Sequence, residues 1–137
     1  MNLSKKLPVI KHLFLNNNYL QNINGINHCS TLESLFLDYN EIRMLNKDDF
    51  IENNNLKVLS FENNKIKSLE FIKVLQKLQK LYAANNCLTN EHEIQYLSLL
   101  NNLEELTFEG NSLYTETNKS EMILQNFELK QHEEEEL

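Results

Sequence analysis

Four histidines and two cysteines are the side chains in this sequence best suited to acid–base catalysis or metal binding. The histidines are His12, His28, His92 and His132. None of them lies at metal-ligand or catalytic-triad spacing from a cysteine or an aspartate. Cys29 and Cys87 lie 58 residues apart and form no CxxC motif, so we expect two reduced and mostly buried thiols. The sequence therefore predicts no catalytic residue and no metal site.

Phosphate-binding loops and carboxylate pairs give no stronger signal for an enzyme. The sequence has no glycine-rich phosphate loop and no GKS or GKT motif. The adjacent carboxylates Asp48–Asp49 and Glu104–Glu105 are typical of solvated segments. We therefore expect a protein that is not an enzyme and that uses no cofactor.

Length and charge exclude several other classes of function. The 137 residues fit one domain, and the net charge of −7 argues against direct binding to nucleic acid. The sequence lacks the run of about 20 apolar residues that a membrane helix requires. Lys11 and His12 interrupt the N-terminal apolar segment, so it does not form a signal-peptide core. We expect a cytoplasmic protein, with a nuclear or a cytoskeletal or ciliary location as alternatives.

The elements that position the remaining candidate residues come from an internal repeat. The pattern LxxLxLxxNxL occurs five times, with other apolar residues at some of the leucine positions. The copies are spaced by 22, 24, 22 and 25 residues and begin at Ile10, Leu32, Leu56, Leu78 and Leu103. The alternation within each copy predicts a short strand with its leucines on one face. Apolar residues at intervals of three then predict a helical or 3₁₀ return path, as at Ile23 and Ile26.

This pattern resembles the leucine-rich repeat family, in the 22-residue subfamily typified by a regulatory subunit of type 1 protein phosphatase. The resemblance covers about residues 7–127. It implies an α/β fold: a right-handed solenoid with a parallel concave β-sheet and a helical or 3₁₀ convex side. It also implies a scaffold or regulatory subunit that binds a partner on the concave face. Three alternatives stay open: a leucine-rich light chain of axonemal dynein, an A-prime subunit of a spliceosomal particle, and the repeat domain of a longer protein such as a tubulin-folding cofactor.

The same register divides the chain into three parts. Residues 1–9 form a short leader, residues 10–127 form the repeats with a partial C-terminal cap, and residues 128–137 form an acidic tail. The segment with the strongest helical pattern is 91–101, with Asn90 as its cap.

One asparagine ends the strand of every repeat. We call these five residues the asparagine ladder: Asn18, Asn40, Asn64, Asn86 and Asn111. Each turn leaves backbone donors and acceptors without partners, and an amide side chain offers both donors and an acceptor. We therefore expect stacked asparagines to satisfy the turns of neighbouring repeats.

Residues between the strand leucines are expected to form a partner-binding surface on the concave face. The candidates are Phe14, Phe36, Asp38, Tyr39, Glu62, Tyr82, Glu105 and Glu109. Charged positions along this face give a net −3, which predicts a protein partner with a basic, partly apolar surface. In the alternative interpretation Phe14 and Phe36 cover each other or lie beneath the N-terminal residues. We expect a monomer or a subunit of a hetero-complex.

Overall fold

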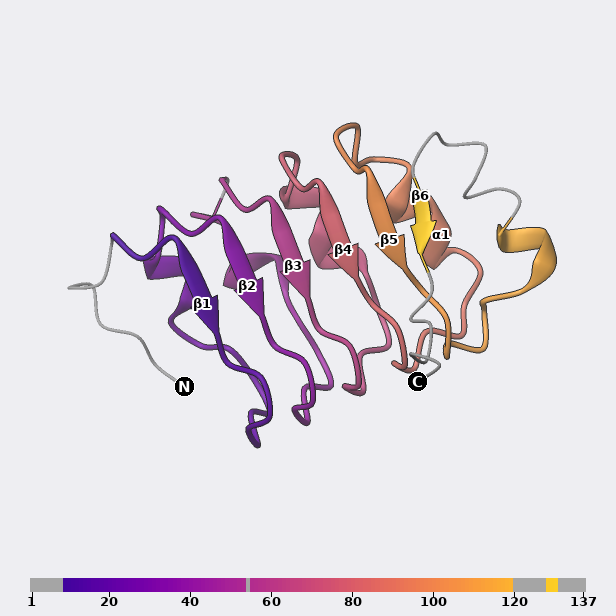
Figure 1. Cartoon of the computed structure of the whole chain (residues 1–137), viewed down its shortest axis with the longest axis horizontal. Coiled ribbons are helices and arrows are strands. Elements are labelled where there is room, and N and C mark those ends of the chain that lie inside the picture. Colours follow the sequence, from indigo (N-terminus) through magenta and orange to yellow (C-terminus); the bar gives the residue numbers. More distant parts are fainter. Residues whose placement is uncertain (1–8, 54, 120–127, 131–137) are drawn as a thin grey trace, which may run out of the picture.

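The computed structural model describes residues 9–53, 55–119 and 128–130, and its core is a parallel sheet (Figure 1). The strands lie in chain order, β1-β2-β3-β4-β5-β6. Their bounds are His12–Phe14, Ser34–Phe36, Val58–Ser60, Lys80–Tyr82, Glu105–Thr107 and Glu128–Lys130. Equivalent repeat positions pair, so that Leu13 aligns with Leu35 and Leu35 with Leu59. The predicted repeat fold is confirmed.

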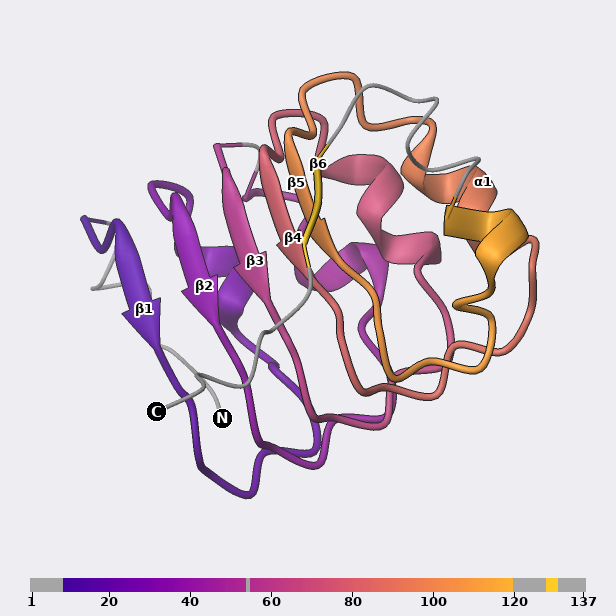
Figure 2. The ribbon, with the colours of Figure 1, turned by 45° about the vertical axis from the view of Figure 1, so that its right-hand side comes forward.

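Short helices form the return path on one side of the sheet (Figure 2). They are η1 (Ile26–His28), η2 (Lys47–Asp49), η3 (Glu70–Val74) and α1 (Glu93–Leu97). We call the opposite side of the sheet the concave face. No helix in the described part of the chain is long and apolar enough to cross a membrane.

Helix α1 is shorter than the predicted segment 91–101. The predicted cap Asn90 is wrong, because the N-cap of α1 is His92 and no side chain caps the helix. Asn90 lies in the preceding turn, where its Oδ1 accepts a hydrogen bond from the His92 N–H at 3.0 Å. On either side of α1 the backbone N–H groups donate hydrogen bonds to carbonyls three residues earlier, as from Leu100 N–H to the Leu97 carbonyl. These bonds tighten the chain into turns, and the apolar spacing alone does not distinguish such turns from an α-helix.

The core lies between the sheet and the return path. Strand leucines such as Leu35 and Leu59 are fully buried against return-path residues such as Ile26 and Ile72. Three phenylalanines contact one another within it, with Phe71 stacked on Phe50 and edge-on to Phe61. One repeat alone cannot bury these side chains, so each repeat depends on its neighbours.

The asparagine ladder joins each repeat to the one before it. Asn64 Nδ2 donates to the Leu37 carbonyl at 2.9 Å and to the Phe61 carbonyl at 3.0 Å, while its Oδ1 accepts from the Ile42 N–H. Asn40, Asn86 and Asn111 repeat this arrangement. Asn18 in the first repeat is exposed, and its Nδ2 donates within its own turn, to the carbonyls of Leu15 and Asn16.

A left-handed residue precedes every ladder asparagine. These residues have φ between 57° and 75° and are Asn17, Tyr39, Asn63, Asn85 and Gly110. Asparagine and glycine tolerate this conformation best, which explains three more of the chain's many asparagines. At Gly110 a Cβ atom would lie 1.9 Å from Asn85 Oδ1, so this turn requires glycine for space as well.

The predicted start of the acidic tail at residue 128 is wrong. Residues Glu128–Lys130 form β6, which continues the sheet beside β5 with Leu129 aligned to Leu106. The segment does not match the full repeat pattern, so only its pairing identifies it as a strand. Residues 1–8 of the predicted leader, 120–127 of the predicted cap and 131–137 of the predicted tail lie outside the described residues.

Replacing Asn64 by alanine is expected to lower the free energy of unfolding by about 1–3 kcal/mol, because buried carbonyls and an N–H lose their partner. Asn24→Ala is the control, since Asn24 is exposed. Urea unfolding of both variants measures the difference. Equal midpoints would contradict a structural role for Asn64.

Candidate functional site

Two stacked phenylalanines dominate the N-terminal half of the concave face. Phe14 on β1 and Phe36 on β2 are aligned in register, and their ring centroids lie 4.8 Å apart with planes 2° apart. Phe14 keeps 67% of its surface exposed, whereas Phe36 is half-buried. The rings therefore cover each other only in part, and one aromatic face remains accessible.

Tyr39 extends this aromatic surface toward the turn that follows β2. Its side chain is 58% exposed, and its backbone has the left-handed φ of 57°. The equivalent residues in the other four repeats are asparagine or glycine. An exposed tyrosine in this conformation costs backbone energy that the other repeats avoid.

A second polar ladder, which the sequence analysis missed, crosses the concave face beside the phenylalanines. Asn16 Oδ1 accepts the Asp38 N–H at 2.8 Å, and Asp38 Oδ1 accepts the Glu62 N–H at 2.8 Å. Asp38 Oδ1 also accepts a 2.6 Å bond from the Ser60 hydroxyl. The signal was the recurrence of polar acceptors at equivalent positions 16, 38 and 62. Asp38 therefore holds neighbouring strands together, and it is only half-buried.

The C-terminal half of the concave face differs from the prediction. Glu62, a predicted partner-binding residue, keeps only 7% of its surface exposed, so the expectation that it faces solvent is wrong. Ser60 and Thr107, which also lie on the concave strands, each keep 2%. Glu62 Oε2 accepts a bond from the Thr107 hydroxyl across 45 residues of sequence. The cause is lateral hydrogen bonding between strands that lie far apart in the chain.

Tyr82 and the remaining predicted acids also make contacts within the chain. The Tyr82 hydroxyl donates to Glu105 Oε2 at 2.6 Å. Burial raises the pKa of Tyr82, and the bond to Glu105 raises it further. Glu109 is half-buried and its Oε2 accepts the Phe108 N–H. The structure thus pairs Phe14 with Phe36 as an exposed aromatic surface, and Tyr39 is exposed in the turn after β2. The acidic residues of the C-terminal half bond within the chain.

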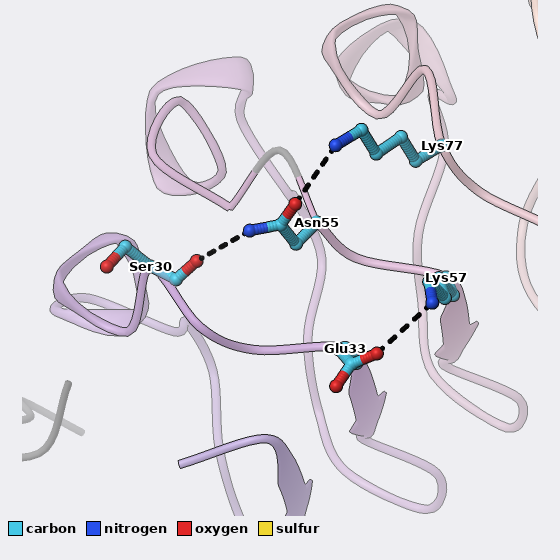
Figure 3. A network of polar contacts seen from close by, with 5 residues as sticks. All are labelled: Ser30, Glu33, Asn55, Lys57 and Lys77. Carbon is cyan, nitrogen blue, oxygen red and sulfur yellow. Dashed lines mark hydrogen bonds and ion pairs between the residues drawn. The ribbon is translucent and has the colours of Figure 1, made fainter. Parts of the chain in front are cut away.

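Polar side chains also connect the repeats along the entry edge, which we define as residues 30–33, 55–57 and 76–77 leading into β2, β3 and β4 (Figure 3). Asn55 donates to the Ser30 carbonyl and accepts from Lys77 Nζ at 3.1 Å. Lys57 forms an ion pair with Glu33 at 3.2 Å. The charges of Lys57 and Glu33 therefore neutralise each other.

The described residues contain no group of three or more histidine, cysteine or acidic side chains that could hold a metal ion. Cys29 is buried, and burial raises the pKa of its thiol. Cys87 is exposed, so the expectation of two mostly buried thiols holds only for Cys29.

Comparison with known proteins supports the leucine-rich repeat fold and assigns no specific function. The leucine-rich repeat family model matches residues 30–88. Internalin C2 from Listeria monocytogenes has a similar structure, with a TM-score of 0.77 and 26% identity over 92% of this chain and 53% of that chain. A leucine-rich repeat protein from Leptospira interrogans has a TM-score of 0.79 and 28% identity over 93% of this chain and 32% of that chain.

A second Listeria monocytogenes internalin, at 19% identity and a TM-score of 0.68, covers 86% of this chain and 40% of that chain and is similar in fold alone. This chain therefore spans at most about half the length of these structures. No curated protein matches its sequence.

Tyr39→Asn is expected to raise the free energy of unfolding by about 0.5–1 kcal/mol, because asparagine tolerates the left-handed backbone better than tyrosine. The reciprocal change Asn63→Tyr is expected to lower it. Urea unfolding measures both changes. A lower midpoint for Tyr39→Asn would show that the tyrosine ring stabilises the turn.

Alkaline pH is expected to destabilise the wild type more than Tyr82→Phe. Since the folded-state pKa of Tyr82 is raised, the stability contributed by its neutral hydroxyl is present below the unfolded pKa of about 10 and is lost as the pH rises above it. Urea midpoints at pH 8 and pH 11 test this. The same fall in both proteins would contradict it.

Proposed function

We propose that this leucine-rich repeat protein is a non-catalytic binding module that holds another protein against the N-terminal half of its concave face. The observation that carries the proposal is the Phe14–Phe36 stack, exposed on adjacent strands of a rigid sheet. Aromatic side chains bury large areas at low entropic cost and often dominate the energy of protein interfaces.

The partner we propose has an apolar segment for the aromatic surface and basic groups around it. Asp38 lies two residues after Phe36 and is half-buried, so a basic group of the partner can approach it. The hydrogen bonds that Asp38 accepts from Ser60 and Glu62 already use one of its oxygens. We therefore expect the aromatic rings to supply most of the affinity and the acidic groups to act mainly on the rate of association.

A scaffold or regulatory subunit is the specific role that we propose for this module. The 22-residue period and the aromatic and acidic residues of the concave face support it by resemblance to the phosphatase regulator subfamily. We propose a cytoplasmic location and a place in a hetero-complex. The identity of the captured partner distinguishes the phosphatase, dynein, spliceosomal and tubulin-cofactor alternatives.

The test compares partner capture by wild type, Phe14→Ala and Phe36→Ala. Tagged wild-type protein is purified from native cells, its partner is identified, and the affinity of that purified partner is then measured. Each substitution is expected to weaken binding about tenfold or more. Circular dichroism checks that each variant is folded.

Tyr19→Ala is the matched control, because Tyr19 is 87% exposed but lies in the turn after β1 rather than on the concave face. It is expected to bind as the wild type does. Equal affinity of Phe14→Ala and wild type, or an equal loss in Tyr19→Ala, would refute the proposed site.

A further inference from the structure

A cluster of positive charge lies on the exit edge, where the strands of repeats two and three turn into the return path. We define the exit-edge cluster as Arg43, Lys65 and Lys67, and all three side chains are exposed. Arg43 and Lys67 occupy the same position in consecutive repeats, as do Glu41 and Lys65. The two neighbouring turns therefore carry the three cations of the cluster and one acidic residue, Glu41.

The backbone fixes these turns side by side. The Lys65 N–H donates to the Ile42 carbonyl at 2.8 Å, and the Glu41 N–H donates to the Leu20 carbonyl at 2.9 Å. A cleft of about 320 Å³ lies between the turns. Its lining residues are Gln21, Asn22, Glu41, Arg43 and Lys65. Amide groups thus stand next to two of the three cations.

Most cations on the other described surfaces have a partner, whereas the three cations of the exit-edge cluster have none among the described residues. Lys57, Lys73 and Lys119 form ion pairs, and Lys77 donates to Asn55. Within the described ranges, no ion pair or side-chain hydrogen bond is formed by the exit-edge cluster. The other lysines without an ion pair there, Lys11, Lys47 and Lys80, lie singly on different parts of the fold.

Three neighbouring like charges repel one another, and an anion placed between them would relieve that repulsion. Such an arrangement is unexpected in a chain whose net charge is −7. Arginine binds a carboxylate with two parallel hydrogen bonds, whereas lysines add positive charge in more variable geometry. Amides such as those of Gln21 and Asn22 can bond to a peptide backbone.

We propose that the exit-edge cluster binds an acidic peptide segment of a partner protein. Arg43 and Lys65 hold carboxylates in the cleft, and Lys67 extends the contact along the edge. Carboxylates are favoured over nucleic-acid phosphates, because three cations beside Glu41 provide little of the dense positive charge that phosphate backbones require. The site is separate from the concave face and opposite to it in charge.

The test uses a probe of that chemistry, acetylated hexaglutamate amide, titrated into the ¹⁵N-labelled full chain at low salt. Amide shifts are expected at residues 41–43 and 65–67. The triple variant Arg43→Ser, Lys65→Ser, Lys67→Ser is expected to bind about tenfold more weakly. The matched control is Lys11→Ser, Lys47→Ser, Lys80→Ser, which removes the same charge and no ion pair of the described residues, and it is expected to retain most of the affinity.

Four outcomes would overturn the proposal. They are the absence of binding, an equal loss in both triple variants, tighter binding of a twelve-residue oligothymidylate than of hexaglutamate, and a tenfold gain when Glu133 to Glu136 are changed to glutamine. The last result would assign the site to the chain's own acidic residues. Phe14→Ala is expected to leave hexaglutamate binding unchanged. The exit-edge proposal and the concave-face proposal can therefore fail independently of each other.

Discussion

The hydrogen bonds of the asparagine ladder are the constraint on which the rest of the structure depends. Each turn after a strand leaves carbonyls inside the solenoid, and the asparagine amide of the following repeat reaches them. A buried carbonyl without a partner would cost more than a typical hydrogen bond contributes. The ladder therefore requires the turns of neighbouring repeats to lie side by side, and this keeps the strands in register.

That register also determines what the concave face can expose. Because equivalent positions align, polar side chains at one repeat position lie next to each other and bond laterally, as Asp38 does with Ser60 and Glu62. These lateral hydrogen bonds stiffen the sheet. The polar side chains that form them are less available to bind a partner protein. The rings of Phe14 and Phe36 form no hydrogen bonds of this kind, so they are more available to contact a partner protein.

The repeat made the architecture predictable from the sequence. Contacts between distant repeats could not be predicted in this way. The spacing of Leu13, Leu15 and Asn18 was sufficient to predict a strand, its buried face and the turn after it. It could not predict that Thr107 would bond to Glu62, because that contact depends on how strands β3, β4 and β5 lie together in the sheet. Strand β6 was missed because Glu128–Lys130 contains one apolar residue and takes its conformation from pairing with β5.

The lateral bonds made by the described residues differ between the first repeat and the repeats that follow it. An interior repeat has a neighbour on each side, so its strand and turn side chains are bonded twice, as Asn64 and Asp38 are. Among the described residues, Asn18 donates to carbonyls of its own turn, and Phe14 stacks on Phe36 of the next repeat. A partner placed across β1 and β2 would bury an aromatic surface that the repeats themselves leave half covered.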